Sequence, residues 1–171
     1  MITDIKIIKD IFPKNINLQI CEYLANQCSW SLAYENDPPY ELIKNNKHLG
    51  FSFCTFNDFK FIQDSFLHQH AYIVFCHILE KLNLKGTLMR SMWNMYLTNQ
   101  SSSLHKDKNE DNYISALYSL HETDGGIEIG NQFFKDQIGE LKVFKSNILH
   151  KGIGPKQSIA RFNLNLVIEL K

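Results

Sequence analysis

The sequence has few cysteines, no excess of either charge and no long uninterrupted apolar run. Its four cysteines, Cys21, Cys28, Cys54 and Cys76, form no C-x-x-C pair, which excludes a zinc-ribbon pattern and a dense disulfide framework. Lysine plus arginine and aspartate plus glutamate number 18 each, so no net field draws the protein to nucleic acid or to an anionic membrane. We expect reduced thiols and a cytoplasmic location.

Targeting and membrane-spanning signals are also missing. The first ten residues carry two aspartates and two lysines among isoleucines, so they lack the continuous apolar stretch of a signal peptide. No apolar run reaches the length of a membrane helix, and there is no internal repeat, low-complexity tract or Gly/Ser linker. A chain of 171 residues that is 44% hydrophobic can bury one core, so we expect a single domain over residues 1–171.

The spacing of apolar residues divides the chain into a helical first part and a strand-rich second part. Spacing near 3.6 residues predicts helices, whereas Pro and Asn clusters predict loops. The predicted elements of the first part are a strand at 5–8, a helix at 17–27, loops and short strands at 30–56 and a helix at 58–82. Residues 1–86 would thus form helices and outer strands around a core of residues 87–171.

The second part consists of short segments with strand-like alternation. Apolar and polar residues alternate over 112–120 and 159–170, and glycines interrupt the pattern between such segments. This arrangement is typical of a jelly roll or an antiparallel barrel. We therefore expect a mainly β chain of the α+β class, a jelly-roll or cupin-like barrel that the helices buttress from outside.

Three residues of the second part form a candidate metal site. His105 and Asp107 are two residues apart, so on a strand both side chains point to one face. His150 follows the strand-like segments 141–144 and 147–149 and could supply a third ligand. Two histidines and one carboxylate form the facial triad that leaves coordination positions open in non-haem Fe(II) oxygenases. Taken alone, the H-x-D pair is common by chance, and a surface pair is the alternative.

The last predicted strand has one polar face and one apolar face. Arg161, Asn163 and Asn165 alternate with apolar residues, so the polar face would look into the barrel if the apolar face packs on the helices. A buried arginine needs an anionic partner. A ligand carboxylate could meet that need through two parallel hydrogen bonds. An exposed arginine on an edge strand is the alternative.

Together these motifs resemble the prolyl-hydroxylase-like branch of the Fe(II)/2-oxoglutarate-dependent oxygenases. The resemblance rests on motif order over residues 90–170. The opening segment 11–30 (IFPKNINLQICEYLANQCSW) is also similar to the start of many relatives. The motifs in chain order are His105-Lys106-Asp107, Gly125-Gly126, a Phe-x-Ser-x-x-x-His segment that ends at His150, and Arg161.

The resemblance implies a double-stranded β-helix and a specific chemistry. Fe(II) would bind to His105, Asp107 and His150, and 2-oxoglutarate would chelate the iron while Arg161 binds its distal carboxylate. With O2, the co-substrate would be decarboxylated to succinate and CO2 as an unactivated C–H bond is hydroxylated. The substrate would be a peptidyl residue, such as proline, or a small molecule, with ascorbate as a candidate reductant.

Three further residues are candidates for binding the co-substrate. Tyr96 resembles a family tyrosine that contacts 2-oxoglutarate, with ordinary packing as the alternative. Ser119 stands where many relatives have a second such tyrosine, which is a departure from the family pattern. Asn163 shares the polar face of Arg161.

Two other functions fit parts of the sequence. One is a catalytically silent jelly-roll or cupin-like module that binds a metal or a ligand, and such a module has no need of an inward Arg161. The other is a zinc hydrolase with the same ligand types, but the sequence lacks an HExxH motif and an obvious general base near the ligands. A 2-oxoglutarate-dependent dioxygenase is therefore the preferred hypothesis. The sequence specifies neither its substrate nor its oligomeric state, because one fold supports many chemistries.

Overall fold

The computed structural model describes residues 4–32 and 50–171 of the chain. In these ranges the chain forms antiparallel strands and two helices. In chain order the elements are β1 (Lys6–Ile8), α1 (Lys14–Gln27), β2 (Ser31–Leu32), β3 (Phe51–Asn57), β4 (Lys60–Phe61), α3 (Ser65–Lys81), β5 (Gly86–Leu97), β6 (Tyr113–Ser119), β7 (Gly126–Ile129), β8 (Gln132–Lys135), β9 (Leu141–Lys145), β10 (His150–Ile153) and β11 (Ala160–Leu170). The predicted mainly β architecture with flanking helices is confirmed.

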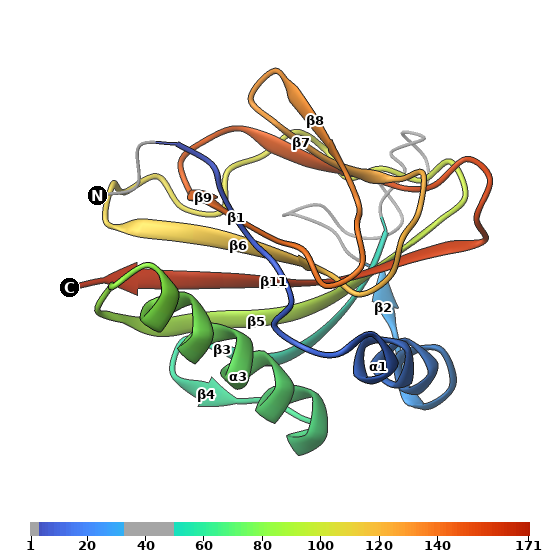
Figure 1. Cartoon of the computed structure of the whole chain (residues 1–171), viewed down its shortest axis with the longest axis horizontal. Helices are drawn as coiled ribbons and strands as arrows, with labels where there is room; N and C mark the ends of the chain where they lie inside the picture. Colours follow the sequence, from blue (N-terminus) through green and yellow to red (C-terminus); the bar gives the residue numbers. More distant parts are fainter. Residues whose placement is uncertain (1–3, 33–49) are drawn as a thin grey trace.

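The strands form two sheets, and the helices lie on one side of the larger sheet (Figure 1). The larger sheet has eight strands in the order β1-β9-β6-β11-β5-β3-β2, with β4 paired to β3, and the smaller sheet has the order β10-β7-β8. Among the described residues the two sheets do not close into one hydrogen-bonded barrel. Isolated bridges from Ser101 to Ile153 and from His105 to His150 tie the segment after β5 to β10.

Two apolar clusters hold these layers together. The larger cluster contains residues of both helices and of the larger sheet, such as the fully buried Leu24 of α1 and Trp93 of β5. The smaller cluster joins the two sheets and consists of Leu117, Ile127, Ile129 and Phe144. Because apolar burial is the main favourable term in folding, these clusters fix the sheets relative to each other and to the helices.

Strand β11 has the two different faces that the sequence predicts. Its apolar residues, among them Leu164, belong to the larger cluster. Arg161, Asn163 and Asn165 face the other way and line a cavity. Arg161 lies opposite Tyr96 of β5 in the strand register. The predicted inward polar face is therefore confirmed.

The second helix begins later than predicted. Asp58 and Phe59 have positive φ angles of 46° and 63° and form a two-residue turn between β3 and β4, the usual geometry of tight hairpins. Helix α3 then starts at Ser65, where the Asp64 side chain caps it by accepting a backbone hydrogen bond. The helix predicted over 58–82 was wrong in its first turns, because apolar residues of the hairpin happen to match helical spacing.

The other elements lie close to their predicted places. α1 begins at Lys14, slightly before the predicted start, and β6 and β11 match the alternating segments 112–120 and 159–170. The predicted loops and short strands over 30–56 are described only in part, because residues 33–49 lie outside the described ranges. Neither of the helices in these ranges has the length and apolar character needed to span a membrane.

A buried hydrogen bond between α1 and β6 should contribute measurably to stability. The Tyr118 hydroxyl donates to Asn17 Oδ1 at 2.8 Å, and both side chains are buried. Tyr118→Phe leaves that oxygen without its donor and should lower the free energy of unfolding, measured in urea, by about 1–3 kcal/mol. The matched change Tyr72→Phe, at a residue that is 50% exposed, should change it by less than about 0.5 kcal/mol. Equal effects of the two substitutions would show that the buried bond adds nothing.

Candidate functional site

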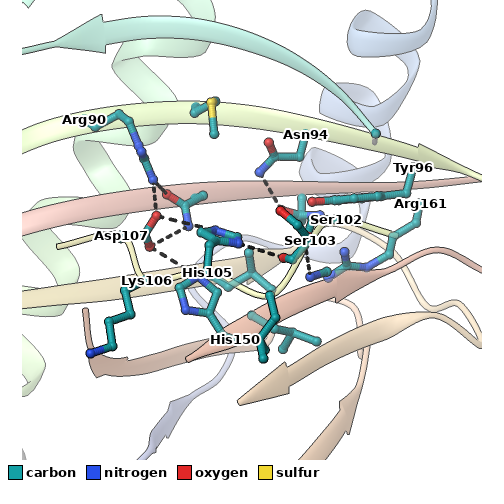
Figure 2. A pocket seen from close by; sticks show the side chains of 18 residues that line it. Arg90, Asn94, Tyr96, Ser102, Ser103, His105, Lys106, Asp107, His150 and Arg161 are labelled. Carbon is teal, nitrogen blue, oxygen red and sulfur yellow. Dashed lines mark hydrogen bonds and ion pairs between the residues drawn. The ribbon is translucent and has the colours of Figure 1, made fainter. Parts of the chain in front are cut away.

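His105, Asp107 and His150 lie together in the structure (Figure 2). One potential ligand atom of each lies within 4.8 Å of the others. The backbones of His105 and His150 pair through two reciprocal hydrogen bonds of 3.0 and 2.9 Å. Nε2 of His150 lies 3.5 Å from Asp107 Oδ2, and Nε2 of His105 lies 4.0 Å from Oδ1. The three residues that the sequence singles out are thus brought together by backbone pairing.

Both histidines turn the same ring nitrogen away from the cluster. Nδ1 of His105 lies 3.0 Å from the carbonyl oxygen of Ser103, and Nδ1 of His150 lies 2.9 Å from that of Ile148. Because a carbonyl can only accept, each Nδ1 carries a proton, so Nε2 is the nitrogen that holds the lone pair in the neutral ring, and it faces the cluster. Nε2 of His150 is buried and has no hydrogen-bond partner in the described part of the chain. This is the orientation that backbone acceptors impose on metal-binding histidines.

The protonation states also suit a metal. Burial lowers the pKa of His150 although Asp107 opposes the shift, so the ring is neutral at neutral pH. Burial alone would raise the pKa of Asp107. The Arg90 guanidinium and a hydrogen bond from Ser115 are among the groups that outweigh burial and hold the pKa of that carboxyl well below its usual range. Neutral imidazole and carboxylate are the forms that bind metals.

Neighbours on three strands of the larger sheet fix the Asp107 carboxylate. Arg90 of β5 forms an ion pair with Oδ1. The hydroxyl of Ser115, on β6, donates to Oδ2 at 2.5 Å, and the amide of Asn165, on β11, donates to Oδ2 at 3.4 Å. Arg90 also donates to Asn165 Oδ1 at 2.9 Å. The carboxylate is therefore held in one orientation before any metal binds.

The cluster lines a cavity of about 580 Å³. In Figure 2, Arg161 and Tyr96 lie on the side of this cavity opposite Arg90 and Asp107. The cavity offers room for a small ligand that extends from the cluster to Arg161. Its polar lining residues outside the cluster are Arg90, Asn94, Tyr96, Ser102, Ser103, Lys106, Arg161, Asn163 and Asn165.

Arg161 already has an anionic partner inside the protein. The sequence had predicted that a ligand carboxylate would be this partner. Both Arg161 and Asp136 are fully buried. Nε of Arg161 donates to Asp136 Oδ2 at 2.5 Å, and Nη2 donates to Oδ1 at 3.3 Å. Nη1 is buried without a hydrogen-bond partner among the described residues. The arginine is thus satisfied on one side only.

The other predicted co-substrate residues lie at different places. Tyr96 lines the cavity, and its ring lies 5.3 Å from Arg161 Cζ. Asn163 also lines the cavity and accepts a hydrogen bond of 3.1 Å from Asn94. Ser119 is fully buried outside the cavity lining, where its hydroxyl donates to the carboxylate that pairs with Arg161. Co-substrate binding by these three residues stays a prediction.

Sequence reasoning missed three residues that support the site. Arg90 lies an even number of positions before Tyr96 on β5, so its alternation with that residue was a usable signal. Ser115 lies an even number of positions before Ser119 on β6, but nothing in the sequence indicated its partner. Asp136 follows β8 in a short irregular stretch, and only the tertiary structure brings it to Arg161.

The metal site predicts the behaviour of one substitution and one control. His150→Ala removes a buried ligand and should abolish tight binding of Fe(II) or Zn(II) in an anaerobic titration. His70→Ala removes a histidine of α3 that lies outside the cluster, and its metal affinity should equal that of the unaltered protein. Undiminished affinity after loss of His150 would remove that residue from the site.

No protein-family model and no curated protein sequence matches this chain. Solved structures with a similar fold do match. An oxidoreductase of the 2OG-Fe(II) oxygenase family from Burkholderia pseudomallei has a TM-score of 0.72 at 12% identity, over 96% of this chain and 84% of that chain. A Pseudomonas putida prolyl-4-hydroxylase has a TM-score of 0.67 at 12% identity, over 98% and 92%.

A third similar structure comes from a different kind of enzyme. The non-heme alpha ketoglutarate dependent epimerase SnoN from nogalamycin biosynthesis has a TM-score of 0.67 at 7% identity, over 96% of this chain and 76% of that chain. At these identities the likeness concerns the fold. The chain therefore has the double-stranded β-helix fold found in 2-oxoglutarate- and Fe(II)-dependent oxygenases, prolyl-4-hydroxylases among them.

Proposed function

We propose that this protein is a non-haem Fe(II)- and 2-oxoglutarate-dependent dioxygenase that hydroxylates an unactivated C–H bond and releases succinate and CO2. One observation carries the proposal. A single cavity presents Nε2 of His150 on one side and Nη1 of Arg161 on another, and neither atom has a hydrogen-bond partner within residues 4–32 and 50–171. The first atom needs a cation and the second needs an anion, which a metal ion and a carboxylate co-substrate together supply.

The metal ligands come from this chain's own geometry. His105, Asp107 and His150 would hold Fe(II) on one face and leave the remaining positions open to small molecules. When bound, the iron and 2-oxoglutarate supply the oxidising chemistry that the amino acids lack. Arg90 and Ser115 keep Asp107 ionised and oriented. The protein thus gathers three ligand atoms within 4.8 Å of one another and holds the carboxylate among them in one orientation.

The co-substrate's distal carboxylate would bind at Arg161. Its Nη1 donor is buried, so a hydrogen bond formed there is not weakened by competition from water. The Tyr96 ring lies 5.3 Å from the Cζ atom of this guanidinium, and Asn163 lines the same cavity. With its distal carboxylate bound at Arg161, the co-substrate would extend its 2-oxo acid end toward the metal cluster. Arg161 would thus act as a positioning group.

The competing functions are less well supported. A zinc hydrolase needs a general base beside the metal, but Asp107 is the one carboxylate among the described residues that line the cavity, and it belongs to the metal cluster. A silent module would have no use for the Arg161 donor that lacks a partner among the described residues, because a buried donor without a partner costs stability. Both alternatives leave part of the cavity unexplained.

The choice of hydroxylation and of a peptidyl or small-molecule substrate is part of the proposal. The similar Pseudomonas putida enzyme is a prolyl-4-hydroxylase, which supports a peptidyl substrate such as proline. SnoN is named as an epimerase, so the shared fold accommodates other outcomes. The product, and not the fold, must therefore decide the reaction type.

Succinate release tests the proposal directly. The protein should release succinate from 2-oxoglutarate in the presence of Fe(II) and O2, and a panel that includes proline-containing peptides should reveal a substrate that gains one oxygen atom. Arg161→Ala should weaken 2-oxoglutarate binding by about 2–5 kcal/mol, the usual cost of truncating a buried charge pair. Arg161→Lys should restore the affinity only in part, because it loses the two-pronged geometry.

A folded control is needed for these variants, because Arg161 also pairs with Asp136. Circular dichroism and metal affinity should match those of the unaltered protein. If the unaltered protein binds Fe(II) but shows no affinity for 2-oxoglutarate, the proposed function is wrong.

Tyr96→Phe separates the hydroxyl of this residue from its ring. The variant keeps the ring that lies against Arg161 and removes the group proposed to hydrogen-bond the co-substrate carboxylate. Affinity for 2-oxoglutarate, measured by calorimetry with Zn(II) in place of iron, should fall by about 1.5–3 kcal/mol, the value of a hydrogen bond to a charged group. An unchanged dissociation constant would assign Tyr96 to packing alone.

A further inference from the structure

Behind the cavity lies a buried cluster of four charged side chains, Arg161, Asp136, Lys142 and Glu140. Arg161, Asp136 and Lys142 are fully buried, and Glu140 is 7% exposed. Nζ of Lys142 lies 3.1 Å from Glu140 Oε1 and 3.8 Å from Asp136 Oδ1. Two positive and two negative groups make the cluster neutral as a whole, which lowers the cost of burying each charge.

The guanidinium of Arg161 has two edges that can each bind a carboxylate, and the protein uses one of them. Asp136 takes the edge formed by Nε and Nη2. The other edge is formed by Nη1 and Nη2, and its buried Nη1 has no partner in the part of the chain that the structure describes. Figure 2 shows the Arg161 side chain extending into the cavity. The free edge is therefore the one available to a ligand.

Asp136 is itself held firmly. The Ser119 hydroxyl donates to Asp136 Oδ1 at 2.9 Å, and Lys142 Nζ donates to the same hydroxyl at 3.3 Å. The backbone N–H of Asp136 donates to the carbonyl oxygen of Gly125 at 3.0 Å. These contacts fix the position and orientation of the Asp136 carboxylate. Because the carboxylate accepts hydrogen bonds from Arg161, it also orients the guanidinium.

We propose that Asp136 is a positioning residue that holds the Nε and Nη2 edge of Arg161 so that Nη1 faces the cavity and binds the distal carboxylate of the co-substrate. The inference rests on the proposed function of the cavity. Without Asp136, Nε and Nη2 would lack acceptors, and the long side chain would turn to find them because unpartnered buried donors are costly. Glu140, on the far side of Lys142, offers such acceptors.

The test compares two ligands that differ only at the distal end. 2-Oxoglutarate carries a carboxylate at C5, whereas 2-oxopentanoate has a methyl group there, and both can chelate a metal through the 2-oxo acid. Calorimetry on the Zn(II)-loaded full chain gives both affinities without turnover. Asp136→Asn keeps the size of the side chain and removes one of the two acceptors for the guanidinium.

The unaltered protein should prefer 2-oxoglutarate, and Asp136→Asn should remove most of that preference. The expected loss of 2-oxoglutarate affinity is about 10- to 100-fold, as for other partners that orient a binding group. Affinity for 2-oxopentanoate and for Zn(II) should not change. A merely structural role of Asp136 would instead weaken both ligands and the metal together.

Glu140→Gln is the matched control. It removes one negative charge from the same buried cluster, but Glu140 contacts Lys142 and not Arg161. If Asp136 acts by position, Glu140→Gln should keep the preference for 2-oxoglutarate. Equal changes in the two variants would show that net charge alone matters and would overturn the inference.

A charge-balanced variant guards against misfolding. If Asp136→Asn is unstable, Asp136→Asn combined with Lys142→Met removes one charge of each sign, and it should show the same selective loss. Retention of the full preference by either folded variant overturns the role of Asp136 while the proposed function stands. No preference in the unaltered protein overturns both.

Discussion

Strand β11 forms backbone hydrogen bonds with both β5 and β6, and this double pairing determines which of its side chains face the cavity. Arg161 lies opposite Tyr96, and Asn163 lies opposite Asn94 on one side and Ser119 on the other. A shift of one residue would turn the polar face into the apolar cluster beneath the helices. The burial of apolar residues such as Leu164 therefore also holds the polar residues at the cavity.

The protein keeps charges of opposite sign at the two ends of the cavity. At one end Asp107 is surrounded by donors, Arg90 and Ser115 among them. At the other end Arg161 is held by the acceptor oxygens of Asp136. Each charge has an internal partner, so it survives burial without a ligand. The site is therefore preorganised, which reduces the ordering that binding would otherwise require.

The sequence predicted those parts of the fold and site that depend on local pattern. Alternation in β11 placed Arg161 and Asn163 correctly, because a strand repeats every two residues. The H-x-D spacing also predicted that His105 and Asp107 lie together, but the strand predicted for them was wrong, because their segment is irregular and meets β10 through isolated bridges at Ser101 and His105. The predicted start of α3 was wrong, because the Asp58-Phe59 turn interrupts apolar residues that otherwise keep helical spacing.

The partner of Arg161 could not be predicted in this way. Asp136 follows β8 and Arg161 lies in β11, 25 positions further along the chain, and no periodic pattern links them. Lys142 looks like an exposed residue within a short strand, yet it is fully buried. Its burial depends on the ion pairs that its ammonium group forms with Glu140 and Asp136, which precede it in the chain. Such clusters follow from tertiary packing and have no local signature.

The burial of an arginine is therefore weak evidence for a ligand, and the unpartnered atoms are stronger evidence. Seven buried side-chain atoms lack hydrogen-bond partners among the described residues, and four of them belong to residues that line the cavity: Arg90, His150, Arg161 and Asn163. These atoms differ in the kind of partner that they need. Nη1 of Arg161 and Nδ2 of Asn163 are donors that need an acceptor, whereas Nε2 of His150 offers a lone pair that needs a cation. A bound metal at one end and a carboxylate at the other complement these atoms together, and neither alone accounts for both ends of the cavity.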